Sequence, residues 1–137
     1  MRIREIQKAV HQYSVEKGWW QGTAGIPLEN LVATKLALIH SEVSEALEDL
    51  RISGGDIKKL SAFLYEHKGP YGSVVDDTKT DDDGKLSKPV GFASELADVV
   101  IRCFDLAGYL GIDLERVIKE KHEYNLTRSF KHGGKAI

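Results

Sequence analysis

Two pairs of acidic residues, each spaced three positions apart, are the features of this sequence most able to do chemistry. Glu42 and Glu45 lie in the segment SEVSEALEDL, and Glu95 and Asp98 lie in ELADVVIRCFDLAGYL. In a helix, residues three apart share one face, so each pair presents two carboxylates side by side. Like charges placed this closely repel each other. The pattern therefore indicates that either water dilutes the repulsion or a bound cation removes it.

The segment around the second pair favours the cation. Its only charged residues are Glu95, Asp98, Arg102 and Asp105, and nearly every other position up to Leu110 is apolar. A surface helix would show a broad polar face, so we predict a buried helix with one narrow acidic seam. Buried carboxylates are costly unless they are paired or bind a metal. Arg102 can pair with Asp98 or Asp105 but cannot neutralise the whole seam. A solvated acidic stripe is the alternative interpretation.

If the two helices pack antiparallel, four carboxylates converge on one spot. The predicted ligands are Glu42, Glu45, Glu95 and Asp98. An all-oxygen cluster favours hard ions, here Mg²⁺ or Mn²⁺. No Glu is followed three residues later by His, which argues against a di-iron bundle. Mg²⁺ held by few protein oxygens keeps positions that phosphate oxygens fill, so the pattern indicates metal-assisted phosphate chemistry.

The segment from residue 113 to 130 adds basic residues along one helix face. Its inward stripe begins with apolar residues and continues as Lys121, Tyr124, Asn125 and Arg128. Lys and Arg near a carboxylate–metal cluster suit a polyphosphate ligand. The alternative is a helix end that emerges into solvent, where basic residues also suit the helix dipole.

Helical periodicity runs through most of the chain and predicts the elements that position these residues. The expected helices span residues 2–17, 28–52, 94–110 and 113–130. Gly18, Gly54 and Gly111 end the first three, and Asp113 is the expected N-cap of the fourth.

Between the second and third of these helices the pattern is weaker. Residues 56–68 are expected to form a short helix and residues 68–90 a polar loop, a candidate substrate lid. No strand pattern competes. The sequence therefore predicts an all-α fold, a bundle of four main helices in a single domain over residues 1–137.

Composition restricts the class of protein. A formal net charge of −2 gives no footprint for nucleic acid, whose binders usually carry a clustered positive excess. Cys103 is the single cysteine, so no intrachain disulfide can form. The chain has no apolar run long enough to span a membrane, and its N-terminus lacks a signal-peptide core. We expect a cytoplasmic protein that binds neither nucleic acid nor membrane.

The acidic pairs also resemble a known family. Glu42-x-x-Glu45 followed by Glu95-x-x-Asp98 is similar to the paired ExxE…ExxD signature of the MazG-like all-α nucleoside triphosphate pyrophosphohydrolases. The segments KPVGFASELADVVIR and KEKHEYNLTRSFKHGGKAI look like that family's third-helix and C-terminal segments. Either acidic motif alone is weak evidence for the family. The two motifs in this order, together with the C-terminal KxxYNxTRxxxHGGK pattern, are fairly specific for it. The resemblance covers most of the chain except roughly residues 53–86, whose role the sequence leaves open.

The resemblance implies an enzyme of nucleotide-pool house-cleaning. It would hydrolyse a nucleoside or deoxynucleoside triphosphate between the α- and β-phosphates, giving the monophosphate and pyrophosphate. The implied cofactor is Mg²⁺, held by the four acids of the paired motif. On that basis Glu42 or Glu45 orients or deprotonates the attacking water. The family also implies a homodimer or homotetramer, in agreement with a third helix too apolar to be covered within one chain.

The remaining roles follow from the same resemblance. Lys121 and Arg128 are expected to hold phosphate oxygens, and Lys121 is also expected to be a catalytic residue. Asn125 is expected to contact phosphate or sugar. Trp20 either stacks on the base or serves in a core or interface.

One position departs from the family pattern. Many members carry an extra acid directly before the first motif Glu, and here that residue is Ser41. The number of metal ions and the identity of a general base therefore stay open, as do the preferred base and sugar. A phosphoribosyl-nucleotide substrate is one alternative, and a non-catalytic helical oligomerisation module of the same fold is another.

Overall fold

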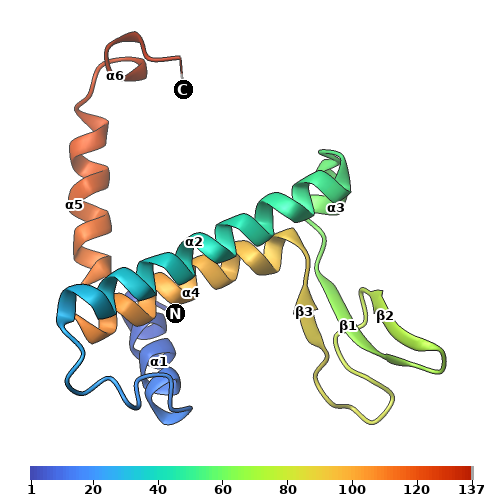
Figure 1. Cartoon of the computed structure of the whole chain (residues 1–137). Helices are drawn as coiled ribbons and strands as arrows, with labels where there is room; N and C mark the ends of the chain where they lie inside the picture. Colours follow the sequence, from blue (N-terminus) through green and yellow to red (C-terminus); the bar gives the residue numbers. More distant parts are fainter. Residues whose placement is uncertain (137) are drawn as a thin grey trace. The chain divides into compact units, whose positions relative to one another are not determined.

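The computed structural model describes residues 1–136, His132 without its side chain, and it is mostly helical with one small antiparallel sheet (Figure 1). The chain divides into two compact units. The first unit consists of Met1–Ala24 and Phe104–Ile137, and the second consists of Gly25–Cys103. Helix α4 (Phe92–Tyr109) contributes its first part to the second unit and its last turns to the first. In the described part of the chain, no helix is long and apolar enough to cross a membrane.

In the first unit, α1 (Ile3–Glu16) is fastened to the start of α5 (Leu114–Leu126), and α6 (Lys131–Gly134) follows. The Arg4 guanidinium forms an ion pair with Asp113 at 2.7 Å, and its backbone N–H donates to buried Glu115 at 3.2 Å. The Gln7 amide donates to the carbonyl of Ile112 at 2.7 Å. These polar contacts fix the turn between α4 and α5 against the first helix.

In the second unit, α2 (Leu28–Ser53) lies antiparallel beside the first part of α4, and α3 (Ile57–Leu60) adds one turn (Figure 1). Contact between α2 and α4 is direct, because the Arg102 side chain on α4 reaches Glu42 on α2. Ala46, one turn after Glu42, is 4% exposed, and its small side chain lets the two helices approach closely. The antiparallel arrangement that the acidic pairs required is confirmed.

Helices α1, α2 and α4 match their predicted boundaries to within two residues because the ends are encoded locally, whereas α5 ends at Leu126, before the predicted end near residue 130. Gly54 caps α2 in the left-handed conformation, with φ of 64°. Asp113 caps α5, its carboxylate accepting the backbone N–H of Arg116 at 3.2 Å. Their assembly into a bundle remains a prediction.

The prediction of a purely all-α fold is wrong between residues 64 and 90. A three-stranded antiparallel sheet occupies this stretch, in the order β2-β1-β3. Its strands are β1 (Leu64–Gly69), β2 (Gly72–Asp76) and β3 (Lys88–Val90). The expected helix over 56–68 is reduced to α3, and the expected polar loop over 68–90 contains two strands. Gly69 and Gly72 close a two-residue hairpin turn, which aligns two short strands whose own alternation is weak.

Large apolar side chains remain exposed on the helices of the second unit. On α2, Leu36, Val43 and Leu47 are 47, 50 and 47% exposed. On α4, Leu96 and Val100 are exposed as well, so the expectation of a fully buried helix holds only for its seam and its last turns.

Candidate metal centre

Three of the four predicted ligands meet between α2 and α4. One carboxylate oxygen from each of Glu42, Glu95 and Asp98 lies within 4.8 Å of the others. Glu42 is 7% exposed, and Glu95 and Asp98 are half-buried. Because α2 and α4 run antiparallel, the i, i+3 spacing on each helix brings the acids to the same level. Glu45 lies outside this group and is exposed, yet close enough to Glu95 to affect its titration.

Glu95 is the acid in the cluster that lacks neutralisation. Its Oε2 atom is buried and has no hydrogen-bond partner among the described residues. Burial, followed by the nearby carboxylates of Glu45, Asp98 and Glu42, raises the pKa of Glu95 from 4.5 to about 7. Burial and Glu42 also raise the pKa of Asp98, an effect that Arg102 partly opposes. The cluster therefore holds more negative charge than its surroundings compensate.

Arg102 forms an ion pair with Glu42 and not with either of the expected partners, Asp98 and Asp105. Its Nε donates to Glu42 Oε1 at 2.5 Å, so its ion-pair partner is on the other helix. The prediction of a partner in Asp98 or Asp105 is wrong, because the antiparallel packing places a buried acid within its reach. Arg102 orients Glu42 and only partly compensates the charge of Asp98, whose pKa stays raised.

The donor set fits a hard divalent ion. All three groups offer carboxylate oxygens, the ligand type that Mg²⁺ and Mn²⁺ prefer. Oxygens that share one Mg²⁺ at about 2.1 Å lie at most about 4.2 Å apart. A small side-chain rotation would bring oxygens within 4.8 Å of one another to that limit. The buried Oε2 of Glu95, which has no hydrogen-bond partner among the described residues, is a candidate ligand.

The predicted phosphate-binding residues belong to the other unit. Lys121 and Asn125 lie on α5, Arg128 follows its C-cap, and all three are exposed. The Lys121 ammonium lies 5.9 Å from the ring centroid of Tyr124. The apolar start of the same stripe is also exposed, as in Val117 at 49%. Within one chain, α5 therefore matches the alternative of a helix that emerges into solvent. Its role toward phosphate stays a prediction.

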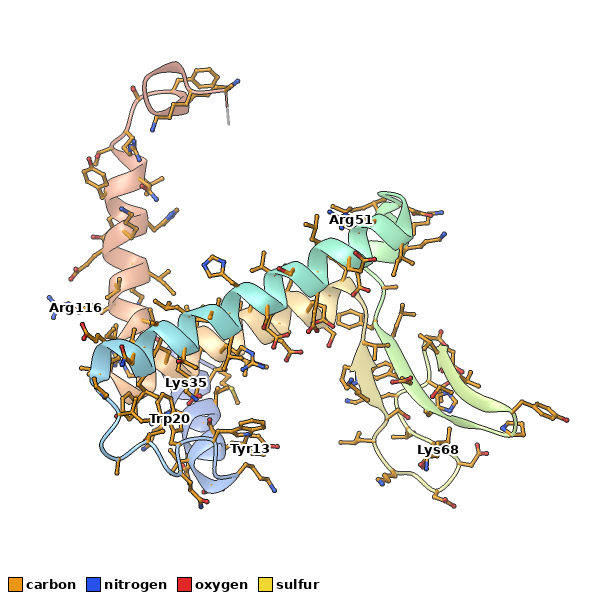
Figure 2. All side chains as sticks on the ribbon, in the orientation of Figure 1. Tyr13, Trp20, Lys35, Arg51, Lys68 and Arg116 are labelled. Carbon is orange, nitrogen blue, oxygen red and sulfur yellow. The ribbon has the colours of Figure 1, made fainter. Side chains whose placement is uncertain are left out.

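Trp20 takes part in a network that the sequence reasoning missed. Its ring stacks on Tyr109 with centroids 4.0 Å apart, and its Nε1 donates to Asp105 at 2.9 Å. Figure 2 labels Trp20. Asp105 also accepts the Ser14 hydroxyl at 2.8 Å and contacts His11 Nδ1 at 2.7 Å. One face of the indole is covered by Tyr109, which accords with the core alternative for Trp20. Its role toward a base is untested.

A glycine inside α4 was the signal for this network. A Cβ added to Gly108 would lie 2.6 Å from the Cβ of His11, so α1 approaches α4 at that position. An isolated glycine in an apolar helical pattern indicates such a close approach. The residue three positions earlier, Asp105, then faces α1 rather than the acidic seam.

Comparisons with known proteins do not identify a family. No family model matches the chain, and the searches of curated proteins and of solved structures find no match. The MazG-like resemblance therefore stays an expectation based on the motif residues.

Proposed function

We propose that this chain is a Mg²⁺-dependent, or Mn²⁺-dependent, nucleoside triphosphate pyrophosphohydrolase acting in the cytoplasm. The observation that supports it is the convergence of Glu42, Glu95 and Asp98, with a buried Glu95 oxygen that has no partner in the described chain. A bound cation would stabilise such a cluster, and a cation held by a few carboxylates suits the phosphates of a nucleotide. The products would be the nucleoside or deoxynucleoside monophosphate and pyrophosphate.

The acids divide into different tasks. Glu95, Asp98 and Glu42 hold the cation, with Glu42 kept in place by Arg102. When bound, Mg²⁺ neutralises phosphate charge, polarises the phosphorus and makes an attacking water more acidic. Glu45 is exposed beside Glu95, and a side-chain hydrogen bond between the two carboxyl groups is one of the causes that raise the pKa of Glu95. Because of its exposure, Glu45 can reach an attacking water. It is therefore better placed than Glu42 to orient or deprotonate water.

The basic residues complete the proposal. Lys121 and Arg128 would hold phosphate oxygens and Asn125 phosphate or sugar, since their exposed donors suit an anionic ligand. The exposed apolar stripes of α2 and α4 support a homodimer or homotetramer.

The test is release of pyrophosphate. Purified protein is incubated with a panel of NTPs and dNTPs, and with a phosphoribosyl-nucleotide, in the presence of Mg²⁺ or of EDTA. We expect pyrophosphate and the matching monophosphate with Mg²⁺ only. Glu95→Gln should abolish turnover. Glu48 is an exposed acid on α2 that forms an ion pair with Arg51, and Glu48→Gln should retain turnover.

The two readouts of this experiment separate its outcomes. Metal binding is followed independently by the rise in melting temperature on adding Mg²⁺. If the protein binds the metal but releases pyrophosphate from none of the substrates, the proposed enzymatic activity is rejected. The alternative of a non-catalytic helical oligomerisation module then remains. Full turnover in Glu95→Gln would reject the assigned centre.

A further inference from the structure

Strand β2 is an open edge of the sheet. The order β2-β1-β3 leaves one side of β2 without a neighbouring strand (Figure 1). Residues 72–75 are exposed, including Val74 at 39% and Val75 at 52%. The strand contains neither Pro nor Lys, the residues that usually protect an edge from pairing with another chain.

The opposite edge of the same sheet is protected. Strand β3 is three residues long, and Pro89 removes a backbone donor at its centre. Lys88 adds a charge to it. The contrast between the two edges indicates that β2 is an edge to be paired.

The hairpin determines which backbone groups of β2 face outward. Its two-residue turn makes Gly69 and Gly72 the closing hydrogen-bonded pair, opposite each other in the register. In an antiparallel ladder the hydrogen-bonded positions alternate. Gly72, Val74 and Asp76 therefore direct their N–H and C=O groups toward β1. Ser73 and Val75 direct theirs outward.

We propose that β2 pairs antiparallel with β2 of a second copy, across a two-fold axis at Val74. In this register Ser73 lies opposite the partner subunit's Val75, and the outward groups of both residues are hydrogen-bonded. Val74 faces the partner subunit's Val74 in a non-hydrogen-bonded pair, where side chains are closest. The two sheets become one continuous six-stranded sheet.

Self-pairing suits this strand better than an unrelated peptide. A two-fold axis at Val74 brings the same five residues of each copy, GSVVD, together in one register. The single acid, Asp76, falls opposite the partner subunit's Gly72, so no like charges meet. Pairing also provides hydrogen-bond partners for four backbone groups of each copy, the N–H and C=O groups of Ser73 and Val75, which water would otherwise solvate. This surface is independent of the metal centre, and the inference holds whether or not the chain hydrolyses nucleotides.

The register is tested by cysteine cross-linking in a Cys103→Ala background. Opposed Val74→Cys residues would have Cα atoms about 4.5 Å apart, within the range of a disulfide. Ser73→Cys is the matched control, because its partner copy lies diagonally, about 7–8 Å away. We expect rapid dimer formation for Val74→Cys under mild oxidation and little for Ser73→Cys. Equal cross-linking of the two variants, or none in either, would overturn the proposal.

A proline substitution tests the hydrogen bonds themselves. Val75→Pro removes an outward N–H while leaving the ladder to β1 intact, and Val75→Thr retains that N–H with a similar shape. Val75→Pro should lower the association constant of one dimerisation step, measured by sedimentation equilibrium, by about tenfold or more. The two-fold axis places the substitution in both copies, so two hydrogen bonds are lost. Val75→Thr should associate like the unmodified chain, and circular dichroism checks that both variants fold. An unchanged association constant in folded Val75→Pro would contradict the pairing.

Discussion

Substitution of Glu95 by Gln should stabilise the metal-free protein above neutral pH. In the folded chain the pKa of Glu95 is raised from 4.5 to about 7, because of burial and the neighbouring acids. At about 1.4 kcal/mol per pKa unit, that difference corresponds to at most about 3 kcal/mol. Partial exposure and rearrangement of the cluster reduce the expected gain to roughly 1–2 kcal/mol. Gln removes the charge and keeps the shape of the side chain.

The pH dependence of stability follows from the same shift. Between pH 4.5 and about 7, Glu95 binds more protons in the folded than in the unfolded state. The free energy of unfolding of the metal-free protein should therefore fall as pH rises through this window. In Glu95→Gln the decrease in the free energy of unfolding should be smaller. The unfolding free energies of the two proteins should therefore be similar near pH 4.5 and differ most at pH 8.

Urea or thermal denaturation in EDTA at pH 4.5 and pH 8 measures both effects. For a domain of this size, 1–2 kcal/mol corresponds to roughly 3–10 °C in melting temperature. Mg²⁺ at about 100 times its Kd should add about 2.7 kcal/mol to the unmodified protein, which reverses the order of the two. Glu48→Gln is the control and should behave like the unmodified chain in every condition. A Glu95→Gln protein that is less stable than the unmodified chain at pH 8 in EDTA would refute the reasoning.

Three further predictions concern charged residues on α4. Mg²⁺ binding at pH 7 should release roughly half a proton, since Glu95 with its pKa of about 7 is then half protonated; calorimetry in two buffers of different ionisation enthalpy measures this, and a heat independent of the buffer would contradict it. Arg102→Gln should destabilise the metal-free protein by about 1–2 kcal/mol in urea, because buried Glu42 loses its ion pair; unchanged stability would show that the pair is not needed. Asp105→Asn should cost about 1–3 kcal/mol and alter Trp fluorescence, because three side chains share the two oxygens of Asp105; a neutral effect on both would disprove the network.

Local signals in the sequence determine the helices and the level at which the acids meet. Capping by Gly54 and Asp113 depends on residues within one turn, and it was predictable for that reason. The i, i+3 spacing required only that α2 and α4 pack antiparallel. The partner of Arg102 was missed, because whether it pairs along α4 or across to Glu42 depends on the distance between two helices.

The sheet was missed for a related reason. Strand β1 reads LYEHKG, which has no strict alternation and contains good helix formers. Its stability comes from pairing with β2 and β3, the latter about twenty residues further along the chain. Propensity in a short window does not contain that information. The Gly-Pro-Tyr-Gly turn was the available signal, since two glycines flanking a two-residue loop indicate a hairpin.

Two acids on α4 show what distinguishes a structural carboxylate from a ligand. Asp105 and Glu95 lie ten residues apart on α4, and both are half-buried. Asp105 receives contacts from Trp20, Ser14 and His11, so its oxygens are satisfied without a cation. Glu95 has a buried oxygen without a partner in the described chain, and other acids surround it. Loss of Asp105 should therefore destabilise the protein by the same amount with and without Mg²⁺. Loss of Glu95 should change from stabilising to destabilising when Mg²⁺ is added, because its charge is unfavourable until a cation is bound.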